Sequence, residues 1–232
     1  MITKTEVKQK TIAKEISLKG VGLHTGKEVT LTFKPAPENF GFAFKRVDLE
    51  GEPVIEADVN YVTNTQRGTR LEKNGVTIQT CEHVLAALVG MDLDNVIIEM
   101  DASEPPIMDG SSKYFVEALE KAGSLSQNAV ICEYAVKDII TYLDEESGSE
   151  ITLIPSDEFC VTAMVDFGTK VLGTQNATLK HMSDFKSQIA DSRTFSFLHE
   201  LEMLLDHGLI KGGDLSNAIV YVDKKISPET ME

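Results

Sequence analysis

The sequence predicts an α+β protein built from two similar units. Short β-prone runs separated by turn residues occupy residues 11–46, helical patterns lie at 81–89 and 112–122, and β-prone runs begin again after residue 130. A weak internal repeat agrees with this, because segments 30–35 and 151–155 both end a strand at a proline. We therefore expect the second unit to repeat the layout of the first.

The first unit is expected to begin with strands and continue with a helix, a strand and a second helix. Residues 12–18, 29–34 and 40–44 are β-prone and form an antiparallel meander, and Asn74-Gly75 predicts a tight hairpin. The helix at 81–89 has Thr80 as its expected N-cap and ends at Gly90. A buried strand at 95–100, a loop at 105–111 and the helix at 112–122 complete the unit.

The second unit is expected to start after a turn-rich stretch at 123–128. Three β-prone runs follow, then two helical patterns and a last strand; they lie at 130–142, 150–154, 159–166, 184–190, 196–206 and 218–222. We place the domains at residues 1–126 and 127–232 and expect the second to be incomplete.

Composition excludes several classes of protein. The formal net charge of −15 over 232 residues, with no cluster of Lys and Arg, argues against a nucleic-acid partner and against an RNA-binding α+β domain. Three widely spaced cysteines fit neither a disulfide framework nor a CxxC metal site. The N-terminus lacks the apolar stretch of a signal peptide, and no run is long enough for a transmembrane segment. We expect a cytoplasmic protein.

The dipeptide Glu82-His83 is the strongest candidate for chemistry. It stands in the first turn of an apolar helix, where a carboxylate can act as a general base and an imidazole can bind a metal. The alternative is structural, because a first-turn Glu also interacts favourably with the helix dipole and a lone His is common on surfaces. These two residues alone leave both interpretations open.

The other candidate residues do not complete a metal site. His199 and His207 are eight positions apart, about 12 Å along a helix, which is too far to share one ion. His24 lies in a glycine-rich turn that lets the backbone approach a ligand. Thr194 precedes a helical pattern, so it is either an N-cap or a hydroxyl that polarises a carbonyl.

Taken together, several segments resemble the UDP-3-O-acyl-N-acetylglucosamine deacetylases, the LpxC family. The resemblance spans nearly the whole chain and keeps the family's order and spacing. It rests on residues 21–26 (Val-Gly-Leu-His-Thr-Gly), 82–88 (Glu-His-Val-Leu-Ala-Ala-Leu), 94–95 (Asp-Asn), 104–111, 192–195 (Ser-Arg-Thr-Phe), and 208–209 with 217–220.

The resemblance implies a fold and a set of roles. It implies two α+β domains, each a mainly antiparallel sheet with two helices, with the helices packed between the two sheets. By the same matching, His83 is one of three Zn2+ ligands, Glu82 is the general base, and Thr194 donates to the developing oxyanion. The implied substrate-binding residues are Leu23, His24 and Thr69 near the site, and Phe195, Phe197, Leu201, Ile210 and Gly213 along a passage for the acyl chain.

The chain also departs from the family pattern. The other two zinc ligands and a general-acid histidine belong to motifs that have no counterpart after residue 220, so we expect them beyond residue 232. The resemblance thus implies the N-terminal portion of a zinc-dependent deacetylase that acts on an acylated UDP-sugar in lipid A biosynthesis. This portion is expected to bind zinc weakly and to be inactive alone. The alternative is a shortened, non-catalytic relative that only binds the acylated UDP-sugar. No partner protein is indicated.

Overall fold

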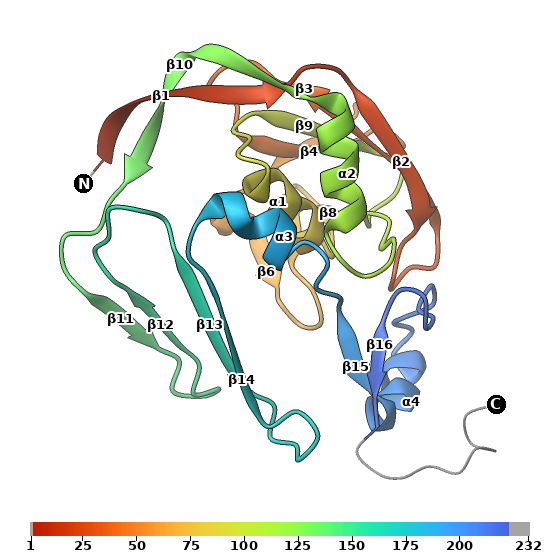
Figure 1. Cartoon of the computed structure of the whole chain (residues 1–232). Coiled ribbons are helices and arrows are strands. Elements are labelled where there is room, and N and C mark those ends of the chain that lie inside the picture. Colours follow the sequence, from red (N-terminus) through yellow and green to blue (C-terminus); the bar gives the residue numbers. More distant parts are fainter. Residues whose placement is uncertain (1, 223–232) are drawn as a thin grey trace.

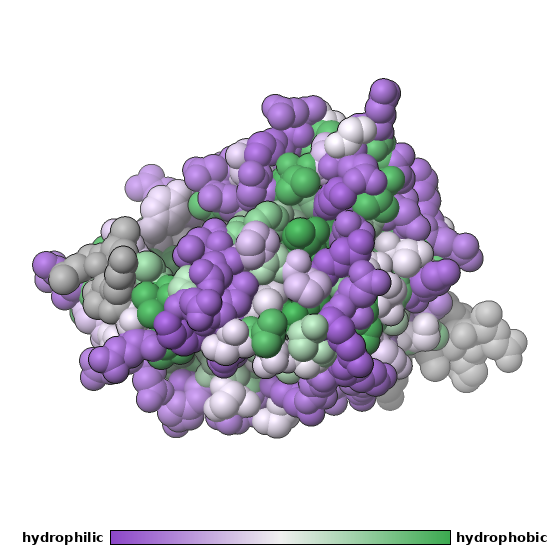
Figure 2. Space-filling view, turned by 90° about the horizontal axis from the view of Figure 1, so that it is seen from above, coloured by the Kyte–Doolittle hydropathy of each residue, from purple (hydrophilic) through white to green (hydrophobic). Residues whose placement is uncertain are grey.

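The computed structural model describes residues 2–222, which form an α+β fold (Figure 1). Most of the buried apolar side chains belong to residues before 123, and only a few, including Leu179, Phe185 and Leu204, come from the later part. Within these residues no helix is long and apolar enough to cross a membrane. Hydrophilic residues cover most of the face shown in Figure 2, with hydrophobic residues between them in small groups.

A five-stranded sheet organises the first unit. Its order is β2 (Ile16–Val21), β3 (Glu28–Pro35), β9 (Val96–Met100), β4 (Phe42–Arg46) and β5 (Val54–Glu56). The expected meander is therefore wrong in one respect, because β9 lies between β3 and β4 and pairs parallel with β4. Val96, Ile98 and Met100 are fully buried, so the most apolar strand takes the centre of the sheet.

Two helices pack on this sheet as expected. Figure 1 shows α1 (Glu82–Gly90) and α2 (Lys113–Ala122) side by side against it. The predicted N-cap of α1 is wrong. Thr80 has a positive φ of 55° and its hydroxyl donates to Glu104, while Cys81 takes the cap position without a side-chain hydrogen bond.

The N-terminal strand forms a long ribbon with a strand from the middle of the chain. β1 (Ile2–Ile12) pairs antiparallel with β10 (Ser124–Tyr134) across the top of Figure 1. The single strand expected at 12–18 is thus divided between β1 and β2, and the turn expected at 123–128 is strand from Ser124 onward. β10 runs through residues 126 and 127, where the domain boundary is expected. The division into two domains stays a prediction.

The second half contains two separate hairpins and short helices. β11 (Ile140–Leu143) pairs with β12 (Glu150–Leu153), and β13 (Val161–Asp166) pairs with β14 (Thr174–Leu179). The strand expected at 130–142 is interrupted between β10 and β11. The helix expected at 184–190 is a single 3-10 turn (Met182–Asp184) followed by α3 (Phe185–Gln188).

Two smaller sheets frame the candidate site. One contains β6 (Val62–Asn64), β7 (Arg70–Lys73) and β8 (Val76–Ile78), preceded by a 3-10 turn (Val59–Tyr61). The hairpin between β7 and β8 is the one predicted from Asn74-Gly75. These two residues have the positive φ values, 52° and 78°, that a tight hairpin turn needs. The other sheet pairs β15 (Phe195–Phe197) in parallel with β16 (Ile219–Tyr221), and α4 (Leu198–Asp206) connects them.

Candidate functional site

Glu82 and His83 lie in the first turn of α1, and neighbouring loops hold both. The Oε2 atom of Glu82 accepts a hydrogen bond from the backbone N–H of Thr69 at 2.9 Å, and Ser112 donates its hydroxyl to the carbonyl of His83 at 2.9 Å. Burial lowers the pKa of His83, against the opposing effects of the charges of Glu82 and Asp109. The imidazole is therefore neutral at pH 7, which is the form that binds metal ions.

The fit of this site to a zinc ion is partial. A catalytic zinc site normally takes three protein ligands. Among residues 2–222 no three His, Cys, Asp or Glu side chains come close enough together to hold a metal ion. His83 can thus supply one ligand, and the described part of the chain does not complete the set.

Glu104 ties the glycine-rich turn to the start of α1. Its side chain is fully buried, and its carboxylate accepts hydrogen bonds from the backbone N–H groups of His24 (3.0 and 3.1 Å) and Thr25 (2.8 Å). The hydroxyl of Thr80 donates a further hydrogen bond to the same carboxylate at 2.9 Å. Thr80 is two residues before Glu82, so this one carboxylate fixes His24 relative to the candidate base.

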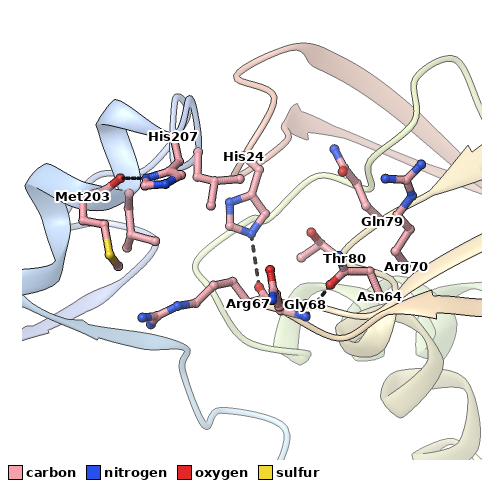
Figure 3. Close-up of a pocket in the computed structure, with 12 residues that line it drawn as sticks. His24, Asn64, Arg67, Gly68, Arg70, Gln79, Thr80, Met203 and His207 are labelled. Atoms are coloured by element: carbon pink, nitrogen blue, oxygen red, sulfur yellow. Dashed lines mark hydrogen bonds between the residues drawn. The ribbon is translucent and has the colours of Figure 1, made fainter.

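The His24 side chain joins two further loops. Its Nε2 atom donates to the carbonyl of Arg67 at 3.2 Å (Figure 3), and its Nδ1 atom accepts from the backbone N–H of Ile210 at 3.4 Å. The backbone N–H of Gly212 also donates to the carbonyl of Leu23 at 3.0 Å. A Cβ on Gly212 would lie 2.4 Å from the carbonyl oxygen of Gly22, so only glycine permits this close approach.

An apolar cavity of about 310 Å³ lies between these loops and α4. Seven of the predicted substrate-binding or catalytic residues line it together, namely Leu23, His24, Thr194, Phe195, Leu201, Ile210 and Gly213. Phe197 is not among the lining residues, but its ring packs edge-on against that of Phe195 at 5.8 Å. Thr69, Glu82 and His83 are not among the residues that line this cavity. Glu82 and His83 begin α1, and Thr69 lies in the loop that bonds to Glu82.

Thr194 is fixed by its backbone rather than by capping a helix. Its N–H donates to the carbonyl of Gly110 at 2.7 Å, and its carbonyl accepts from Ile219 at 3.0 Å. The helix α4 begins only at Leu198, so the N-cap alternative for Thr194 is wrong. Within residues 2–222 the Thr194 hydroxyl has no hydrogen-bond partner, so it is available to a ligand in the cavity that Thr194 lines.

One ion pair beside this cavity was not predicted from the sequence. Arg67 donates to the carboxylate of Glu200 through both terminal nitrogens, at 2.6 and 3.2 Å. The pair links the loop that contacts Glu82 to the first turn of α4. The two residues are 133 positions apart, so no local pattern in the sequence could have predicted the contact.

Comparison with known proteins identifies close relatives. Residues 9–231 match the family described as LpxC, UDP-3-O-acyl N-acetylglycosamine deacetylase. A protein named bifunctional enzyme LpxC/FabZ from Bacteroides thetaiotaomicron is 46% identical over 226 residues, which are 97% of this chain and 49% of that protein. The protein of the same name from Porphyromonas gingivalis is 45% identical over 225 residues, again 97% of this chain and 49% of the relative.

A shorter relative is covered more fully. The UDP-3-O-acyl-N-acetylglucosamine deacetylase of Saccharophagus degradans is 42% identical over 221 residues, which are 94% of this chain and 72% of that protein. The chain thus spans about half the length of the two bifunctional relatives and over two thirds of this one.

Proposed function

Because the chain belongs to the UDP-3-O-acyl N-acetylglycosamine deacetylase family, we propose that its protein removes the N-acetyl group of a UDP-3-O-(3-hydroxyacyl)-N-acetylglucosamine. This hydrolysis would be the committed step of lipid A biosynthesis. One observation supports the proposal most directly: residues assigned to the acyl passage from separate parts of the sequence meet around one apolar cavity.

Glu82 is the proposed general base. The bond from Thr69 to its Oε2 atom restrains the carboxylate and leaves Oε1 without a hydrogen bond from the described residues. A carboxylate held in this way can accept a proton from the water that attacks the amide. The attack places negative charge on the acetamide oxygen, and the Thr194 hydroxyl is the proposed donor to it.

The proposed cofactor is zinc, with His83 as one ligand. The neutral, partly buried imidazole fits this role, and the remaining ligands would come from residues outside 2–222. When bound, zinc supplies Lewis acidity toward the amide carbonyl. Elemental analysis of the longer protein should find about one zinc per chain, and His83→Ala should lower that content.

The apolar cavity is proposed to hold the acyl chain. Leu201 and Ile210 supply aliphatic walls and Phe195 an aromatic one, and such surfaces favour a hydrocarbon chain over water. Because Leu201 lines this cavity of about 310 Å³, the larger side chain of Leu201→Trp should obstruct it. We expect this variant to raise KM for the acylated substrate by about tenfold, which corresponds to roughly 1.4 kcal/mol of binding energy.

The decisive test is acetate release by the longer protein that contains this chain. Purified protein should release acetate from the acylated UDP-sugar, and Glu82→Gln should lower kcat by about 100-fold to 10,000-fold because the base is lost. Glu28→Gln, an exposed change on β3, is the matched control and should leave kcat unaltered. Tight binding of the substrate without acetate release would support the non-catalytic alternative instead.

A further inference from the structure

A second cavity, of about 490 Å³, lies on the other side of the contact between His24 and Arg67 (Figure 3). Both of those residues line both cavities and form part of the wall between them. The remaining lining residues are Asn64, Gln66, Gly68, Arg70, Gln79, Thr80, Met203, Leu204, His207 and Leu209. No Asp or Glu lines this cavity, although the chain as a whole carries a net charge of −15.

One wall of the second cavity is a row of hydrogen-bond donors on β6, on β7 and at the residue that follows β8. Asn64 on β6 pairs with Arg70 on β7, and Gln79 directly follows Ile78, whose partner on β7 is Leu71. Leu71 and Ile78 are buried on the core face, so Arg70 and Gln79 belong to the opposite face. Cross-strand neighbours have Cβ atoms about 5 Å apart, a spacing that lets their side chains contact one small group.

Several donors in this wall have no partner among residues 2–222. The side-chain amides of Gln66 and Gln79 make no hydrogen bond there. The Oδ1 atom of Asn64 accepts from the backbone N–H of Gln66 at 2.6 Å, which leaves the NH2 group of Asn64 as a free donor. These three amides can therefore donate to a ligand without breaking an existing bond.

Arg70 adds a positive charge to this wall. One of its terminal nitrogens donates to Glu72 at 3.0 Å, but that pair is well exposed, at 42% and 36% of the two side chains, and such surface pairs contribute little. Its Nε atom is buried and has no hydrogen-bond partner, the one such side-chain nitrogen or oxygen in the described chain. A buried N–H without a partner costs folding free energy. A ligand oxygen could satisfy this N–H after a shift of the Arg70 side chain, whose residue lines the cavity.

We propose that Asn64, Arg70 and Gln79 form a binding site for an oxyanion, the phosphate or carboxylate group of a small molecule. Guanidinium and amide donors match such oxygens, and no Asp or Glu lines the cavity itself, the carboxylate of Glu72 being bonded to Arg70 from outside the lining. Met203, Leu204 and Leu209 on the opposite side give the less polar part of the ligand an apolar surface. The site borders Gly68 and Thr80, which flank the candidate base, but its existence does not depend on the proposed deacetylase activity.

The test is calorimetric titration of the protein with inorganic phosphate and, separately, with acetate, at constant ionic strength set by chloride. We expect saturable binding, and Arg70→Gln should weaken it by at least about tenfold because a charge-assisted hydrogen bond is lost. Lys73→Gln removes the same charge from the same strand but outside the cavity, and it should change the affinity by less than about twofold.

Each outcome bears on the site directly. Binding of phosphate alone assigns a phosphate-bearing ligand, and equal binding of acetate extends the assignment to carboxylates. Absence of saturation with either ion would contradict the proposal, as would equal weakening by Lys73→Gln and Arg70→Gln. If Arg70→Gln does not fold, Gln79→Leu removes a second donor of the row and provides the same comparison.

Discussion

The hydroxyl of Thr80 donates a 2.9 Å hydrogen bond to the carboxylate of Glu104, and both side chains are buried. This bond holds Thr80 in a left-handed conformation, with φ of 55°, directly before α1 begins. The same carboxylate holds the backbone of His24. One buried group thus sets the relative positions of the glycine-rich turn and the helix that carries Glu82 and His83.

Replacing this carboxylate should weaken the fold. In Glu104→Gln one acceptor oxygen and the negative charge are lost, so the backbone N–H groups of His24 and Thr25 share a single uncharged oxygen and lose their charge-assisted hydrogen bonds. We expect the free energy of unfolding to fall by about 1–3 kcal/mol in urea denaturation. The control Glu28→Gln, at the exposed first residue of β3, should change it by less than about 0.5 kcal/mol, and an equal loss in both variants would contradict this account.

Replacing Gly110 with alanine should destabilise the fold through a steric clash as well as through its positive φ. A Cβ at this position would lie 2.0 Å from the carbonyl oxygen of Asn217, where the segment after α4 meets the first unit. Gly51 has a similar φ, 76° against 84°, but no atom lies within 4 Å of its Cβ position. Gly51→Ala should therefore cost about 1 kcal/mol for the backbone alone.

Gly110→Ala should cost more than that control by at least about 1–3 kcal/mol, since overpacking adds to the backbone term. Thermal unfolding of both variants measures the difference. Similar melting temperatures would show that the Asn217 segment can move away without loss. Binding of an acylated ligand should also weaken in Gly110→Ala only, because Thr194 bonds to the carbonyl of Gly110.

Local chemistry predicted the elements well, but long-range pairing was harder to predict. The Asn74-Gly75 hairpin and the helix containing Glu82 follow from residues within a few positions of each other. The insertion of β9 between β3 and β4 depends on which strand is most apolar in the assembled sheet, and a single-strand pattern does not encode that order.

In the candidate site, too, some features could be predicted from local sequence and others depend on the fold. The Glu82-His83 pair and the apolar residues of the cavity are visible in the sequence because each has a local motif. In the sequence Glu104 is distinguished only as part of the motif at 104–111, whereas its function as a buried acceptor depends on His24 and Thr80, which approach it through the fold. The pairing of Arg67 with Glu200 likewise needs the docking of α4.

The three cysteines should differ sharply in reactivity. Cys81 is fully buried, and burial raises the pKa of its thiol to about 12. Cys132 and Cys160 are exposed. Because the thiolate is the reactive form, iodoacetamide at pH 8 should label the two exposed cysteines and leave Cys81 unmodified until denaturant is added. Mass spectrometry of tryptic peptides measures this, and early labelling of Cys81 would show that the start of α1 opens readily.

The pairing of Arg67 with Glu200 should depend on pH. The hydrogen bond from Arg67 lowers the pKa of Glu200 from its ordinary value of 4.5. A carboxylate whose pKa is lower in the folded state stabilises the protein above its unfolded-state pKa, and this contribution is lost as the pH falls through the folded-state value. The stabilisation should therefore be complete at pH 7 and should decline only as the pH falls below 4.5.

A double-mutant cycle isolates this contribution. The variants Arg67→Met, Glu200→Gln and the combination of both should give a coupling energy of about 0.5–1 kcal/mol at pH 7, a modest value because both side chains are partly exposed. The coupling should approach zero once Glu200 is protonated, and 1 M salt should reduce it at pH 7 by screening. A coupling that stays constant between pH 7 and pH 3.5 would mean that packing of the two side chains, rather than their charges, links the loop before Thr69 to α4.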